Sequence, residues 1–156
     1  MKILLVEDDI MLNEMIAEYI TSTGHIIKSV KTGTESLQIL EKEKFDLLIL
    51  DINLPDIDGF TILEKMHEQK RMIPTIYISA LIDIEDISRA FDLGCFDYLK
   101  KPFQLKELTL RINKILKTRI VPQTHKRLSK HYSFDSENMT LLYNNEPHIL
   151  PKRQLQ

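Results

Sequence analysis

The sequence has few of the features that mark secreted, disulfide-bonded or membrane-spanning proteins. It contains one cysteine among 156 residues, which excludes an internal disulfide. No apolar run approaches the roughly 20 residues that a membrane-spanning helix needs, and no signal-peptide pattern precedes the first predicted strand. The five histidines are scattered, without the spacing of metal ligands. We therefore expect a cytoplasmic protein without a membrane partner.

Length and charge favour one domain followed by a different segment. A chain of 156 residues that is 43% hydrophobic has room for one full domain and part of another. Residues 1–119 carry 20 acidic and 16 basic side chains (net −4), whereas residues 120–156 carry 3 and 5 (net +2). The basic tail permits a nucleic-acid partner but does not argue strongly for one.

Apolar residues alternate between strand-like runs and helical spacing along the first 119 residues. Because each strand is followed by one helix, the pattern predicts an α/β fold of five βα units, a doubly wound parallel sheet. The expected strands are 2–6, 26–30, 46–50, 75–79 and 96–99, and the expected helices are 10–23, 34–43, 58–70, 83–93 and 104–118.

Acidic residues follow two of the predicted strands. Glu7, Asp8 and Asp9 come after the first strand, and Asp51 follows the third. In a parallel sheet the carboxyl ends of the strands share one edge, so these side chains should meet there. Helix capping accounts for one acid, but several clustered carboxylates would repel one another without a cation. Oxygen ligands without His or Cys favour Mg²⁺.

Two further polar residues end the last two strands. Ser79 closes the fourth strand and Lys101 follows the fifth. Each could be an ordinary strand-end residue, yet together they offer a hydroxyl donor and a mobile cation, which suit an anion.

Four motifs now appear in order: Lys2-Ile-Leu-Leu-Val-Glu-Asp-Asp, Leu50-Asp-Ile-Asn-Leu-Pro-Asp-Ile-Asp-Gly, Tyr77-Ile-Ser-Ala and Asp97-Tyr-Leu-Lys-Lys-Pro-Phe. They resemble the receiver (CheY-like) domain of two-component response regulators, over residues 1–119. The resemblance implies a flavodoxin-like sheet with strand order 2-1-3-4-5. It also implies a phosphorelay protein that is not an enzyme beyond accepting and losing its own phosphoryl group.

The resemblance assigns a metal site to the acidic motifs. It implies that Glu7, Asp8 and Asp51 hold Mg²⁺ together with the main-chain carbonyl of Asn53. Asp9 lies just outside the matched acidic pair, and we interpret it as a helix cap.

The resemblance also assigns the phosphoryl chemistry. Asp51 would accept a phosphoryl group from the phosphohistidine of a sensor histidine kinase. Ser79 and Lys101 would bind phosphate oxygens. Movement of Ser79 would vacate space into which Tyr98 turns, and this would switch the surface of the fourth helix, fifth strand and fifth helix.

Related regulators form homodimers through that surface. Asp97, Glu107 and Arg111 match the charged pattern of the resembled subfamily, whereas Ile87 and Phe96 replace charged residues. One interpretation is that both apolar side chains turn inward. The alternative hypothesis is an apolar homodimer that depends less on salt and on phosphorylation.

The remaining residues divide into a polar linker over 120–131 and strand-like pieces over 132–135, 139–143 and 148–150. Residues 132–156 resemble the first part of the winged-helix effector of the OmpR/PhoB type, here truncated. Promoter DNA is therefore expected as a partner only of a protein with a complete effector. A tail with a single hairpin is the alternative.

Two other functions are compatible with a doubly wound sheet. An aspartyl-nucleophile phosphatase would want a second acid two residues after Asp51, where this chain has Asn53. A flavin carrier would want a Ser/Thr/Gly-rich loop after the first strand, where this chain has three acids. We therefore favour a phosphorylation-operated transcription regulator.

Overall fold

The computed structural model describes residues 1–80, 83–94, 96–120, 125–127, 132–135, 140–143 and 146–147, with side chains up to residue 118 except at the gaps. Its two units, Met1–Lys114 and Ile115–Gln156, are taken separately below. Within the described part, no helix combines the length and the apolar character needed to cross a bilayer.

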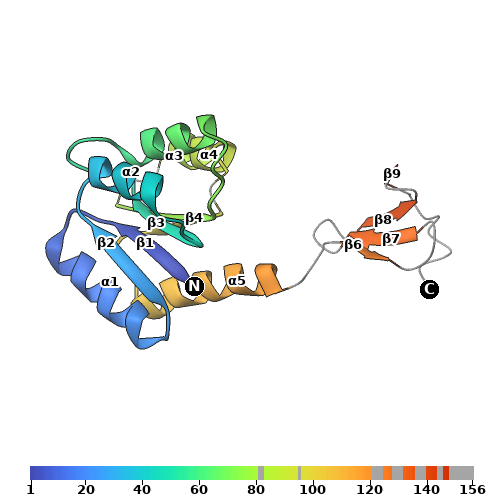
Figure 1. The fold of residues 1–156 in the computed structure, drawn as a ribbon, viewed down its shortest axis with the longest axis horizontal. Helices are drawn as coiled ribbons and strands as arrows, with labels where there is room; N and C mark the ends of the chain where they lie inside the picture. The colour runs from blue at the N-terminus through green and yellow to red at the C-terminus, as the bar shows by residue number, and fades with distance from the viewer. Residues whose placement is uncertain are drawn as a thin grey trace. The chain divides into compact units, whose positions relative to one another are not determined.

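A five-stranded parallel sheet forms the centre of the first unit (Figure 1). The strands lie side by side in the order β2-β1-β3-β4-β5, so the predicted fold class and strand order are confirmed. The strands are β1 (Lys2–Val6), β2 (Ile26–Val30), β3 (Leu47–Asp51), β4 (Thr75–Ser79) and β5 (Asp97–Lys100).

Helices cover both faces of the sheet, with α2, α3 and α4 on one side and α1 and α5 on the other (Figure 1). This arrangement buries the strands on both faces, which is why β3 and β4 are buried at every position. The helices are α1 (Ile10–Ser22), α2 (Gly33–Lys42), α3 (Gly59–Glu68), α4 (Ile84–Asp92) and α5 (Leu105–Ile120).

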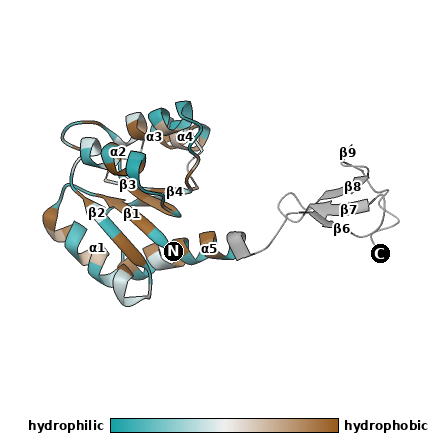
Figure 2. Ribbon diagram, in the orientation of Figure 1, coloured by the Kyte–Doolittle hydropathy of each residue, from teal (hydrophilic) through white to brown (hydrophobic). Residues whose placement is uncertain are grey.

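The core follows the alternation of side chains along each strand. One face of β1 and β3 supplies Leu4, Val6, Leu48 and Leu50 to a cluster with Tyr77 of β4. Residues of the opposite face of these strands are equally buried, as Ile3, Leu5, Leu47 and Ile49 show. Figure 2 shows the hydrophobic colour along the central strands, whereas the helices carry both hydrophobic and polar colours.

Acidic side chains begin the two helices nearest the acidic motifs. Asp9 is the N-cap of α1 and accepts a hydrogen bond from the Leu12 amide at 2.8 Å. Asp58 caps α3 in the same way, with the Thr61 amide at 2.7 Å. The interpretation of Asp9 as a helix cap is therefore confirmed, because its side chain satisfies an amide that the first turn of α1 leaves without a helical partner.

The second unit contains an antiparallel sheet in the order β6-β7-β8-β9. Its strands are β6 (His125–Arg127), β7 (Tyr132–Asp135), β8 (Thr140–Tyr143) and β9 (Glu146–Pro147). The sequence analysis missed β6, which lies inside the predicted linker, and β9, which lies between the strand-like pieces predicted at 139–143 and 148–150. The predicted third strand at 148–150 falls outside the described residues. The domain limits 1–119, 120–131 and 132–156 stay a prediction.

Candidate functional site

The carboxyl edge of the parallel sheet brings together the residues singled out in the sequence. Glu7 directly follows β1, Asp51 is the last residue of β3, Ser79 is the last residue of β4, and Lys101 directly follows β5. Because β1, β3, β4 and β5 are neighbours in the sheet, residues distant in the chain converge on one short stretch of this edge.

Lys101 lies between two buried carboxylates. Its Nζ is 2.7 Å from Glu7 Oε2 and 2.8 Å from Asp51 Oδ2. The Glu7 side chain is 0% exposed and that of Asp51 5%. Burial alone would lower the pKa of Lys101, but the two carboxylates outweigh it and raise that pKa above its usual value. The lysine is therefore held as a cation.

Only one of the two carboxylate oxygens of Glu7 accepts a well-formed hydrogen bond. Its Oε1 accepts a hydrogen bond from the Asp9 amide at 3.0 Å. Its buried Oε2 has no well-directed hydrogen bond, although the Lys101 ammonium lies within ion-pair distance. Burial raises the pKa of Glu7 to about 6, with the Asp51 charge adding to the effect and Lys101 opposing it. A carboxylate oxygen in this condition can take a further cation.

The acidic cluster has the ligand chemistry of a hard divalent cation. Among the described residues, Glu7, Asp8 and Asp51 each offer a carboxylate oxygen, and these oxygens lie within 4.8 Å of one another. Asp8 is exposed, so one side of the cluster is open to water. Mg²⁺ takes a few carboxylates and keeps several waters. The residues therefore fit this ion.

Asn53 lies beside the acidic cluster. Its amide donates to Asp51 Oδ1 at 3.0 Å, and its Nδ2 lies 3.5 Å from Ser79 Oγ. These contacts link the loop after β3 to the end of β4. The role of its carbonyl as a metal ligand stays a prediction.

Tyr98 lies next to the buried part of β4. It is half-buried and packs against the core cluster that includes Tyr77, with which it is in register across β4 and β5. Ser79 at the end of β4 is fully buried. The switch roles of Ser79 and Tyr98 stay predictions.

The charged residues predicted for the dimer surface contact one another within the chain. Arg111 Nη1 donates to both carboxylate oxygens of Asp97, at 3.1 and 3.0 Å. Arg111 Nη2 is also 3.5 Å from Glu107 Oε1, one helical turn earlier. These three side chains form a local cluster on β5 and α5.

Two residues of that surface, Ile87 and Phe96, are apolar where the resembled subfamily has charged residues, and both are half-buried. Neither is fully turned inward, and the Lys114 ammonium lies 5.9 Å from the centroid of the Phe96 ring. Two neighbours of Ile87 on α4 are more exposed, Ile84 at 82% and Phe91 at 52%. Because Ile84, Ile87 and Phe91 are spaced three and four residues apart, they share one face of α4.

Two residues that the sequence analysis did not select hold the loops of this site. Asn13 is only 3% exposed, and its Nδ2 donates to the carbonyls of Glu7 and Val30. Asp56, in the loop after β3, accepts from the amides of Gly33 and Thr34, both at 2.8 Å. Helical spacing could have identified Asn13, because it shares the buried face of α1 with Ile16 and Ile20.

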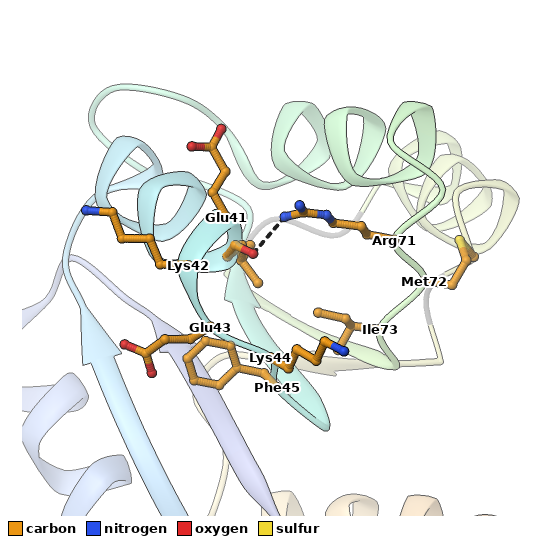
Figure 3. Close-up of a pocket in the computed structure, with 9 residues that line it drawn as sticks. Glu41, Lys42, Glu43, Lys44, Phe45, Arg71, Met72 and Ile73 are labelled. Atoms are coloured by element: carbon orange, nitrogen blue, oxygen red, sulfur yellow. Dashed lines mark hydrogen bonds between the residues drawn. The ribbon is translucent and has the colours of Figure 1, made fainter.

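A separate groove of about 420 Å³ lies at the opposite edge of the sheet, where β3 and β4 begin (Figure 3). Leu40, Phe45 and Ile73 contribute apolar lining, and Arg71 Nη1 donates to the Leu40 carbonyl at 2.8 Å. Since the acidic cluster lies at the carboxyl ends of the strands, this groove is not part of it.

The strand order defines a flavodoxin-like α/β domain, and an acidic cluster with one lysine lies at the carboxyl ends of its strands. The family model of the response regulator receiver domain matches residues 3–113. The chain therefore belongs to the response regulator receiver domain family.

Known proteins agree with this assignment. The chain is 36% identical over 117 residues to the transcriptional regulatory protein RprY of Bacteroides fragilis, covering 75% of this chain and 50% of RprY. The receiver domain of the Francisella response regulator 1452 superposes with a TM-score of 0.72 at 29% identity, over 76% of this chain and 98% of that one.

The match to response regulator DrrB, a Thermotoga maritima OmpR/PhoB homologue, extends further. It has a TM-score of 0.68 at 25% identity and covers 98% of this chain and 68% of DrrB. The resemblance to the OmpR/PhoB subfamily is thereby confirmed. This chain spans about half the length of the curated relatives it matches.

Proposed function

We propose that this protein accepts a phosphoryl group on Asp51 from the phosphohistidine of a sensor histidine kinase. The observation that carries the proposal is the position of Asp51 Oδ2, 2.8 Å from Lys101 Nζ and within the three-carboxylate cluster. The proposed acceptor carboxylate thus has both a cation and the carboxylate oxygens of Glu7 and Asp8 close to it.

In the proposed step an Asp51 carboxylate oxygen attacks the phosphorus atom. A P–O bond forms, the P–N bond to the histidine breaks, and its electron pair returns to the imidazole nitrogen. Mg²⁺, held by Glu7, Asp8, Asp51 and the Asn53 carbonyl, would supply charge neutralisation. Such reactions depend mainly on positioning and electrostatics.

Two residues serve the phosphoryl group once it is bonded. The Lys101 ammonium, freed from the Asp51 carboxylate, pairs with a phosphate oxygen, and the Ser79 hydroxyl donates to another. Displacement of Ser79 then opens space for Tyr98, which changes the surface of α4, β5 and α5. A local change of charge would in this way shift a two-state element.

Intact-mass analysis after exposure to a small phosphodonor tests the assignment. We expect the wild type to gain one phosphoryl group only when Mg²⁺ is present. Asp51→Asn should gain none, and Asp8→Ala should lose most of the gain. Asp92→Asn, which changes an exposed acid of α4, is the matched control and should be phosphorylated. An equal gain in Asp51→Asn, or in EDTA, contradicts the assignment.

A homodimer through α4, β5 and α5 is part of the proposal. The apolar face of Ile84, Ile87 and Phe91 supports it, because burying one such side chain contributes about 1.5–3 kcal/mol, whereas an exposed ion pair contributes about 0–1 kcal/mol. A two-fold interface buries each side chain twice. The dimer should therefore resist salt and need phosphorylation less than one bridged by charges.

Sedimentation across a salt series tests the homodimer. The unphosphorylated wild type should be dimeric at tens of micromolar concentration, and Ile87→Lys should be monomeric. Ile26→Lys introduces the same charge at an exposed position of β2 (69% exposed) and should leave the dimer intact. A monomeric wild type, or a dimer that dissociates as salt rises, refutes an apolar interface.

The output of the proposed switch is transcription. The relative RprY is named a transcriptional regulatory protein, and DrrB is described as an OmpR/PhoB homologue. By analogy, the receiver unit would act in the cytoplasm and control promoter DNA through residues outside 1–119. In this role the protein turns over no separate substrate, and added phosphoesters should not be hydrolysed catalytically.

A further inference from the structure

Asn13 holds the turn that carries the acidic pair. Its side chain lies in the first turns of α1 and is only 3% exposed. The Nδ2 nitrogen donates to the Glu7 carbonyl at 2.9 Å and to the Val30 carbonyl at 3.1 Å. The Glu7 amide donates to the same Val30 carbonyl at 3.2 Å. One side-chain amide thus joins the ends of β1 and β2 to α1.

These bonds restrict the path of the chain between Glu7 and Asp8. The Glu7 carbonyl and the Asp8 amide belong to one planar peptide unit, so a bond on that carbonyl fixes the direction in which Asp8 leaves the sheet. The Glu7 side chain is fixed separately by the Asp9 amide. Asn13 therefore acts on the backbone that carries both acids and touches neither carboxylate.

The turn needs such a restraint because its acids repel one another. Carboxylate oxygens of Glu7, Asp8 and Asp51 lie within 4.8 Å, and Lys101 contacts only Glu7 and Asp51 among them. Repulsion favours a movement of the exposed Asp8 side chain into solvent, away from the other two carboxylates. A restraint on the backbone keeps Asp8 within reach of a shared cation.

We propose that Asn13 is a positioning residue that orients Glu7 and Asp8 for the binding of a divalent cation. This inference rests on the proposed metal site. The identity of the side chain matters, because one amide nitrogen carries two hydrogens and can satisfy two carbonyls. An aspartate has the same shape but presents only acceptors to them.

Calorimetric titration of the full chain with Mg²⁺ tests the proposal. Residues that orient metal ligands typically change metal affinity by about 10- to 100-fold when replaced. We expect Asn13→Ser to bind Mg²⁺ about 10-fold more weakly than the wild type. Asn13→Asp should also bind more weakly, although its added negative charge would by itself attract the cation. Loss of the two hydrogen bonds thus predicts a lower Mg²⁺ affinity for Asn13→Asp, whereas the added charge alone predicts a higher one.

Thr75→Val is the matched control. It removes a buried hydroxyl that donates to the Ile73 carbonyl at 3.0 Å, at the opposite edge of the sheet. It should lower the stability to urea and leave the Mg²⁺ affinity unchanged. A second measurement follows phosphorylation by a small phosphodonor. In Asn13→Ser the Mg²⁺ concentration for half-maximal rate should rise about 10-fold, while the rate at saturating Mg²⁺ stays at the wild-type level.

The outcomes separate the inference from the function on which it rests. A wild type that does not titrate with Mg²⁺ overturns the metal site itself. A wild type that binds Mg²⁺, with Asn13→Ser within twofold of it or Asn13→Asp equally tight, overturns the role of Asn13 alone. Equal weakening in Thr75→Val also overturns it, because the effect would then follow stability. If Asn13→Asp does not fold, Asn13→Ser decides by the same criterion.

Discussion

Replacing Glu7 by glutamine should stabilise the metal-free protein at alkaline pH. Glu7 is fully buried, and its burial beside Asp51 raises its pKa from 4.5 to about 6. Glutamine keeps an oxygen that can accept from the Asp9 amide, as Glu7 Oε1 does. It removes the charge that burial makes unfavourable. We therefore expect Glu7→Gln to be more stable than the wild type when no divalent cation is present.

The magnitude and the sign follow from proton binding. A rise from 4.5 to about 6 corresponds to about 2 kcal/mol, because each pKa unit is worth about 1.4 kcal/mol. Between these two pH values the folded state binds more protons than the unfolded state, so the contribution of Glu7 to stability falls as pH rises. The raised pKa already includes the opposing attraction of Lys101, so we expect a gain of about 2 kcal/mol for glutamine at pH 8.

Urea unfolding followed by circular dichroism measures this difference. In EDTA, Glu7→Gln should exceed the wild type in stability at pH 8, and the two should converge as pH falls below 4.5, where Glu7 is protonated in both the folded and the unfolded protein. Added Mg²⁺ should stabilise the wild type more than the variant, because a ligand stabilises the state that binds it. Glu14→Gln, at an exposed position of α1, is the control. A Glu7→Gln protein less stable than the wild type at pH 8 in EDTA refutes the reasoning.

Three further predictions concern the loops around the site. Asp56→Ala should lower the free energy of unfolding by about 1 kcal/mol, because it removes the acceptor of two amides at the start of α2. Hydrogen bonding from Thr34 lowers the pKa of Asp56, so the wild-type advantage, measured by urea unfolding, should be present at neutral pH and shrink as pH falls below the usual range of an aspartate. Lys101→Met should bind Mg²⁺ more tightly by calorimetry, because it removes the cation that competes for Glu7 and Asp51; weaker binding would contradict this. Gly59→Ala should lower the melting temperature and slow phosphorylation of Asp51, because its Cβ would lie 2.6 Å from the Asp51 carbonyl oxygen; an unchanged protein would show that the loop yields freely.

Much of the site could be predicted because the topology of the fold determines it. Glu7, Asp51, Ser79 and Lys101 each stand at the end of a strand-like run in the sequence. Once the runs are assigned to a parallel sheet, their carboxyl ends share an edge. The confirmed order β2-β1-β3-β4-β5 then brings residues 50 positions apart within 2.8 Å, as Lys101 and Asp51 show. No detail of side-chain packing is needed for this step.

The contacts that loops make could not be predicted from the sequence. Asp56 bonds to residues 22 and 23 positions earlier in the chain, and the path of its loop decides that contact. Asn13 could be placed on the buried face of α1, but its two carbonyl partners depend on where β1 and β2 end. The helix predicted over 58–70 ends at Glu68, and Lys70 adopts a φ of 55°, which an α-helix does not allow.

Short strands were missed for a different reason. The three residues of β6, His125–Arg127, carry no apolar alternation, so no periodic signal was present. The strand is defined by antiparallel pairing with β7, which is a property of the partner strand as much as of the segment. Short edge strands of this kind are read poorly from local pattern alone.

The charge balance of the site explains why its parts belong together. Three carboxylates within 4.8 Å and one ammonium group leave a formal charge of −2 when all are ionised. Lys101 already contacts the two buried acids, so it cannot also neutralise Asp8 on the exposed side. Burial raises the pKa of Glu7 to about 6, and the nearby negative charge of Asp51 adds to this effect. The positive charge of Lys101 opposes the rise but does not cancel it. A divalent cation would correct it. In the proposed function, the phosphoryl group then brings new negative charge to Asp51, and Lys101 is the cation positioned to follow it.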